Sequence, residues 1–157
     1  MSDRGSQRTT SSTGTAGVYA ALSQLWRLPG VSATNFPDHT PGIDLIALHD
    51  GQICTIQVKS TSSDLRRWRL YDDGRFPDVA VFILVAVHSA GEADAFFVVP
   101  TAALADATEA SYHRWRARHD DRETESRFLG FDEPEGAAFL EPYRDRWDLL
   151  FSSDGGS

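Results

Sequence analysis

The sequence predicts a single α/β domain in which helices cover the faces of a β-sheet. Three observations indicate this fold class: a helix-like segment comes first, a cluster of apolar strand-like runs follows, and helix-like segments come after it. At 157 residues, of which 41% are hydrophobic, the chain is long enough to form one domain with a buried core.

The segment before the strand cluster begins with a polar stretch. Residues 1–13 are rich in Ser, Thr and Gly and are expected to form a disordered tail. A helix is predicted from about Thr15 to Leu28, because its apolar residues recur at helical spacing and Pro29-Gly30 stops it. A short strand is expected around Val31 to Phe36.

The centre of the chain carries a strong signal for a β-hairpin. Two strand-like runs, Ile43 to Leu48 and Gln52 to Lys59, flank Asp50-Gly51. Asp-Gly between alternating apolar runs is typical of a two-residue turn. In that register His49 faces Gln52 at the turn, and pairing the strands inward from there places Asp44 opposite Gln57.

Three more strands and two more helices are expected after the hairpin. The strands cover Trp68 to Tyr71, Val79 to Val87 and Ala95 to Val99. Thr101 is expected to cap a helix that extends to about Arg118. Residues 120–135 are interpreted as an acidic loop, Glu141-Pro142 as the start of a last helix, and residues 152–157 as a second disordered tail.

Composition and charge argue against several classes of protein. The net charge of −8 is unlike that of a protein that coats nucleic acid through bulk positive charge, although a small basic site on an acidic body is compatible with it. The single cysteine, Cys54, excludes an intramolecular disulfide, and the cytoplasm is the expected location. No apolar run is long enough to span a bilayer, so no membrane partner is expected.

Lys59 is the one lysine of the chain, beside fourteen arginines. In the predicted hairpin it shares a sheet face with Asp44 and Gln57, since directly opposed residues and residues two apart on a strand lie on the same face. Oxygen ligands can hold Mg²⁺, and an ammonium can stabilise the charge that develops during phosphodiester hydrolysis. The alternative is a polar patch on the exposed side of a hairpin.

The hairpin motif is similar to that of a known family. The segments Gly42-Ile43-Asp44-Leu45-Ile46-Ala47 and Ile56-Gln57-Val58-Lys59-Ser60 resemble the PD-(D/E)XK nuclease superfamily in its Gln-x-Lys form, including small bacterial members and Holliday-junction-resolvase-like proteins. The resemblance implies a restriction-endonuclease-like core over residues 14–151, with a mixed β-sheet of four or more strands flanked by helices. It also implies a Mg²⁺- or Mn²⁺-dependent endonuclease acting on DNA, for which a homodimer is plausible.

The same resemblance assigns roles to four residues of the hairpin. Asp44 is the principal metal ligand, Gln57 offers its side-chain oxygen, and the backbone carbonyl of Val58 completes the metal site. Lys59 is the catalytic ammonium. The chain departs from the family at Gln57, where most members have a carboxylate, and this loss of one charge predicts weaker metal binding.

The chain departs from the family in the first helix as well, because relatives carry a Glu there. No acidic residue lies between Arg4 and Phe36. Asp38 is the nearest substitute in the sequence, and Asp64 or Asp78 could approach the site only through the fold. The alternative function is therefore a catalytically degenerate module that binds nucleic acid or a protein partner.

A basic segment follows the motif strand and supplies the candidate nucleic-acid contacts, which are Arg66, Arg67, Trp68 and Arg69. The arginines are expected to contact phosphates, and Trp68 is expected to stack on a base. For Trp68 the alternative is packing in the core.

Overall fold

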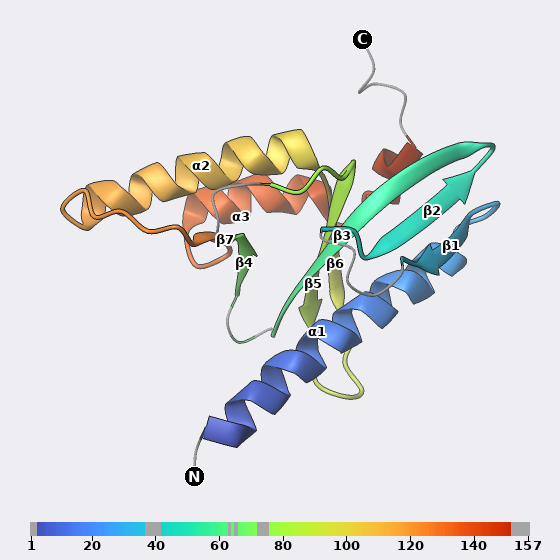
Figure 1. Cartoon of the computed structure of the whole chain (residues 1–157), viewed down its shortest axis with the longest axis horizontal. Helices are drawn as coiled ribbons and strands as arrows, with labels where there is room; N and C mark the ends of the chain where they lie inside the picture. The colour runs from blue at the N-terminus through green and yellow to red at the C-terminus, as the bar shows by residue number, and fades with distance from the viewer. Residues whose placement is uncertain (1–2, 37–41, 63, 65, 72–75, 152–157) are drawn as a thin grey trace.

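A computed structural model of the chain describes residues 3–36, 42–62, 64, 66–71 and 76–151. Within these residues it contains a five-stranded mixed sheet, a two-stranded sheet and three α-helices (Figure 1). The α/β fold class predicted from the sequence is therefore confirmed. None of the helices described is both long and apolar enough to span a bilayer.

The larger sheet has the strand order β1-β2-β3-β5-β6. Its strands are β1 (Ser32–Asn35), β2 (Leu45–His49), β3 (Gln52–Ser62), β5 (Val81–Val87) and β6 (Ala95–Pro100). β3 and β5 are parallel, and the other neighbours are antiparallel. The first five residues of β5 are all buried, as expected for a strand with both faces covered.

Helix α1 (Asp3–Trp26) covers one face of this sheet (Figure 1). Leu25 of α1 belongs to the same buried cluster as Ile56 and Val58 of β3. Gly17 lies where the helix crosses β3, and a Cβ atom at this position would collide with the side chain of Ser60. The absence of a side chain at Gly17 therefore sets how closely α1 approaches the sheet.

The opposite face of the sheet carries a second buried cluster, which includes Phe82, Leu84 and Phe97. It is covered by a two-stranded sheet and two helices (Figure 1). These elements are β4 (Arg67–Tyr71), β7 (Arg127–Gly130), α2 (Thr101–Arg118) and α3 (Pro134–Leu140). The five-stranded sheet thus separates two cores, and each side chain of β3 belongs to one side or the other.

Several predicted boundaries are corrected by the structure. Helix α1 begins at Asp3, before the start predicted near Thr15, because extending an existing helix adds a backbone hydrogen bond per residue. Thr101 does not cap α2: Pro100 occupies the cap position, and the buried Thr101 hydroxyl has no hydrogen-bond partner among the described residues. The predicted acidic loop contains β7 and the start of α3.

The last predicted helix is also corrected. From Glu141 to Phe151 the chain forms two short 3₁₀ helices, η1 (Glu141–Tyr143) and η2 (Trp147–Phe151). Asp145, between them, has a positive φ of 53°, which interrupts a continuous helix. Trp147 and Phe151 pack against the α1-side core.

Candidate active site

The predicted hairpin and its register are confirmed. Residues pair from Leu45 opposite Ile56 to His49 opposite Gln52. The turn residues Asp50 and Gly51 both have positive φ, at 48° and 76°, as a tight two-residue hairpin turn requires. Asp44 stands one residue beyond the last of these pairs.

Two hydrogen bonds hold Asp44 against β3. Its backbone N–H donates to the carbonyl oxygen of Ile56 at 2.9 Å. Its carboxylate oxygen Oδ2 accepts a hydrogen bond from the N–H of Val58 at 2.8 Å. The backbone of β3 therefore fixes the Asp44 carboxylate beside the residue that separates Gln57 from Lys59.

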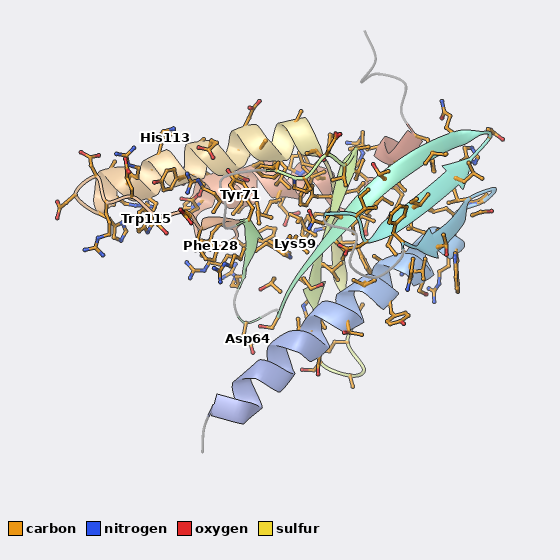
Figure 2. The ribbon with its side chains drawn as sticks, viewed as in Figure 1. Lys59, Asp64, Tyr71, His113, Trp115 and Phe128 are labelled. Atoms are coloured by element: carbon orange, nitrogen blue, oxygen red, sulfur yellow. The ribbon has the colours of Figure 1, made fainter. Side chains whose placement is uncertain are left out.

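The side chains of Gln57 and Lys59 lie on the face of β3 that is turned away from α1. The parallel register places them beside Phe82 and Leu84 of β5, which belong to the second core. Lys59 is half-buried near the middle of the molecule (Figure 2), and no ion pair joins it to a carboxylate of the residues described. The only lysine of the chain is therefore partly desolvated and not neutralised by a described acid.

The Gln57 side chain carries an orphaned polar atom. Its oxygen Oε1 is buried and has no hydrogen-bond partner among the described residues. A buried polar atom without a partner costs about 1–3 kcal/mol. A ligand that interacts with an amide oxygen would remove this cost.

The donor atoms of this patch fit a hard cation to a limited extent. Asp44 supplies the carboxylate and Gln57 a neutral oxygen, and Mg²⁺ prefers oxygen ligands, often one or two carboxylates with waters and substrate phosphates. Among the described residues, no group of three or more His, Cys, Asp or Glu could hold a metal ion. The donor types of this patch suit a divalent cation such as Mg²⁺, which would need further oxygen ligands from water or a bound phosphate.

Helix α1 and the patch lie on opposite faces of the five-stranded sheet. α1 packs on the Ile56 and Val58 side of β3, and the sheet separates it from the side chains of Gln57 and Lys59. Of the substitutes proposed from the sequence, Asp38 lies outside the described residues. Asp64 and Asp78 are exposed.

The side chains of the basic segment at the start of β4 point alternately to the core and to solvent. Trp68 is buried at 1% exposure, and its indole N–H donates to the carbonyl oxygen of Val85 at 3.1 Å. Of the two alternatives for Trp68, stacking on a base and packing in the core, the structure shows packing in the core. Arg66, Arg67 and Arg69 are exposed, and their role as phosphate contacts stays a prediction.

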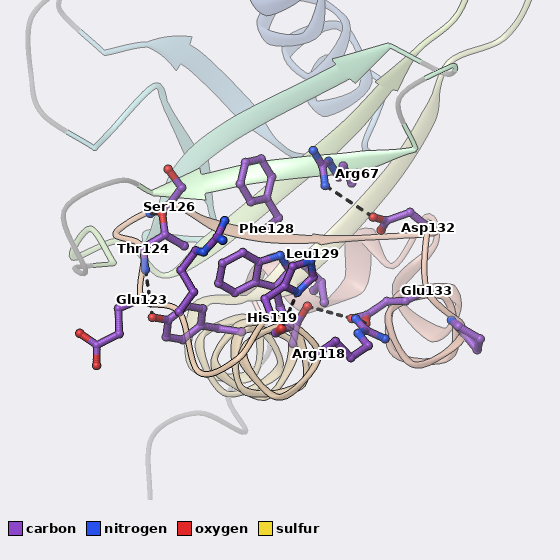
Figure 3. A pocket seen from close by; sticks show the side chains of 15 residues that line it. Arg67, Arg118, His119, Glu123, Thr124, Ser126, Phe128, Leu129, Asp132 and Glu133 are labelled. Atoms are coloured by element: carbon purple, nitrogen blue, oxygen red, sulfur yellow. Dashed lines mark hydrogen bonds and ion pairs between the residues drawn. The ribbon is translucent and has the colours of Figure 1, made fainter.

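A groove that the sequence analysis did not predict lies between α2 and the two-stranded sheet (Figure 3). Its volume is about 850 Å³, and its lining includes Tyr112, Trp115, Phe128 and Arg67. The three-residue spacing of Tyr112 and Trp115 was a signal for a shared helix face. The contribution of Phe128 to the groove could not be predicted, because its strand, β7, lies in the segment that the sequence indicates is an acidic loop.

Comparison with known proteins supports the fold. The structure is similar to a solved structure of a bacterial homing endonuclease, I-Ssp6803I, with a TM-score of 0.52 and 16% sequence identity over 88% of each chain. At this identity the similarity applies to the fold, which resembles that of a restriction-endonuclease-like homing endonuclease. Neither a protein-family model nor a curated protein sequence matches the chain.

Proposed function

We propose that the protein is a metal-dependent nuclease that hydrolyses phosphodiester bonds in DNA. The observation that carries this proposal is the Asp44 carboxylate, held by the Val58 N–H between Gln57 and the lone lysine, Lys59. The buried Gln57 oxygen supports it, since none of the described residues gives this atom a hydrogen bond. The nuclease-like fold favours DNA as the substrate.

Each residue of the patch has a distinct role in this proposal. Asp44 and Gln57 hold Mg²⁺ or Mn²⁺ through side-chain oxygens, with the Val58 carbonyl as a further ligand. When bound, such an ion supplies Lewis-acid polarisation of a phosphoryl oxygen. The Lys59 ammonium orients a water molecule and stabilises negative charge that develops on the phosphate, and its partly buried position strengthens this effect.

The proposal is tested by replacing Asp44 with its neutral isostere. Asp44→Asn keeps an oxygen that accepts the Val58 N–H but removes the carboxylate charge. We expect Mg²⁺-dependent nicking of supercoiled plasmid to fall by at least about 100-fold, since a metal ligand stabilises the transition state by several kcal/mol. The control is Asp106→Asn, at an exposed position of α2, which should retain wild-type nicking. Equal nicking by wild type and Asp44→Asn would contradict the proposed site.

A second function is favoured by the single carboxylate of the patch. No cluster of three metal-ligating acids, cysteines or histidines exists among the residues described. A nuclease fold without catalysis would bind DNA in the absence of metal, with an affinity that falls steeply as salt rises. Metal-free, salt-sensitive binding that is weakened by Arg66→Ala and Arg67→Ala, together with no nicking by wild type, would support this function.

A further inference from the structure

The groove between α2 and the two-stranded sheet has planar aromatic walls. On α2, the rings of Trp115 and His119 are stacked, with centroids 4.5 Å apart and an interplanar angle of 17°. Tyr112 lies nearly parallel to Trp115, at 14° and 6.2 Å. Phe128 lines the groove from β7 (Figures 2 and 3). The aligned rings of α2 form a platform on which another flat ring can stack.

Some charged side chains of the groove are paired within the protein, and others are exposed. Glu133 accepts hydrogen bonds from Arg114 at 2.7 Å and Ser111 at 2.8 Å, and it forms an ion pair with Arg118 at 3.5 Å. Burial opposes ionisation of this carboxyl, but these partners hold the pKa of Glu133 below its usual value. Glu133 is therefore paired within the protein. It does not neutralise the other arginines of the lining, which can contact a ligand.

Two arginines remain accessible to an anionic ligand. Arg67 has only a long ion pair, 3.9 Å from Asp132, in which both side chains are about half exposed, and such pairs contribute little. Its guanidinium also lies over the Phe128 ring, 4.6 Å from the centroid. Arg122 is exposed, and no ion pair joins it to another described residue. The groove thus combines flat rings with guanidinium groups at its rim.

We propose that this groove binds an unpaired base of single-stranded DNA. The base stacks on the aromatic lining that includes Trp115 and Phe128, and the neighbouring phosphates contact Arg67 and Arg122. Stacking on aromatic rings tolerates any base, because every base has a π-face, and arginines at the rim add charge and cation–π contributions. The volume of about 850 Å³ is sufficient for a nucleotide.

The inference deepens the proposed nuclease function and rests on it, by naming the substrate class as DNA with unpaired bases. Arg67 lines this groove, and its neighbour Arg66 lines a smaller pocket together with Thr61 and Ser62. Thr61 and Ser62 end β3, two and three residues after Lys59. The arginine pair therefore connects the groove with the strand that carries the candidate catalytic ammonium.

The inference is tested by fluorescence anisotropy with a fluorescein-labelled dT12 strand in buffer without divalent metal. Trp115→Leu and Phe128→Leu keep apolar volume but remove the flat ring, and each should weaken dT12 binding by about tenfold. A strand of twelve abasic sites should bind wild type more weakly than dT12 does. Trp26→Leu is the matched control, because Trp26 is 63% exposed on α1, away from the groove lining, and it should bind like wild type.

Arg122→Gln is a second variant, at an exposed position. It should reduce the affinity for dT12 and the salt dependence of that affinity. The temperature of thermal unfolding should stay unchanged. Equal affinity of wild type for dT12 and the abasic strand would overturn the inference, as would wild-type affinity in both leucine variants. The absence of dT12 binding to wild type would also overturn it. Failure of plasmid nicking is measured separately, so loss of the nuclease function is distinguishable from loss of this site.

Discussion

The Asp44 carboxylate owes its position to features that are local in the sequence. The Asp50-Gly51 turn sets the hairpin register, and strand alternation places Gln57 and Lys59 on one face. Both could be predicted, because they depend on neighbours within a few residues. The buried state of the Gln57 oxygen could not, since it depends on how β3 packs against β5 and the second core.

Replacing Gln57 with Glu should strengthen metal binding. The variant adds a formal charge beside Asp44, and ligand charge is a main determinant of affinity for hard cations. We expect the Mn²⁺ dissociation constant, measured by isothermal titration calorimetry, to fall on the order of tenfold. The control is Gln52→Glu, which adds the same charge at an exposed position of the same strand. An equal effect of both variants would argue against a site at Gln57.

At the scale of elements, strands and helices with strong periodicity could be predicted, and those stabilised by tertiary contacts could not. β3, β5 and β6 have clear apolar patterns and lie where the sequence predicts them. β7 has only four residues in an acidic surrounding, and its pairing with β4 depends on residues about 60 positions away. The close approach of α1 to β3 likewise depends on a contact that the sequence does not reveal.

The α1 contact is tested by comparing two glycines of the same helix. Gly17→Ala places a Cβ atom against Ser60 and should lower the free energy of unfolding by about 1–3 kcal/mol, as overpacking does in other cores. Gly14→Ala meets no atom within 4 Å and should be neutral or raise it by up to about 1 kcal/mol, through helix propensity. Urea unfolding measures both variants. Equal destabilisation by the two substitutions would contradict the packing described for α1.

The junction of α2 and α3 should be sensitive to acid through Glu133. Its partners hold the folded-state pKa below the usual value of 4.5, so its contribution to stability is present above that value and lost as pH falls through the folded-state pKa. Glu133→Gln should lower the free energy of unfolding by about 1–3 kcal/mol at neutral pH. The difference from wild type should shrink from about pH 5 to about pH 3.

The measurement for this junction is urea unfolding at a series of pH values. Glu135→Gln is the control, since Glu135 is an exposed residue of the same region and should give no pH-dependent difference from wild type. A difference between Glu133→Gln and wild type that stays constant down to pH 3 would show that Glu133 does not stabilise the fold through its charge.

At the scale of the whole molecule, the two faces of the five-stranded sheet support different parts of the structure. One core holds α1 against the sheet, and the other supports both the Gln57 and Lys59 face and the aromatic groove. The groove could not be predicted, because its lining joins Arg67 with residues 111–134. The net charge of −8 requires that any contact with DNA be local, at arginines and Lys59, rather than spread over the surface.

The most direct test of the central claim is the rate of plasmid nicking by wild type and Lys59→Met in the presence of Mg²⁺. Methionine keeps much of the lysine side-chain volume and removes the ammonium, while Arg27→Gln removes an exposed cation outside the candidate sites as a control. We expect Lys59→Met to nick supercoiled DNA at least about 100-fold more slowly than wild type, and Arg27→Gln to change the rate by less than about threefold. Equal rates for wild type and Lys59→Met would contradict the claim that Lys59 serves a phosphodiester-cleaving site.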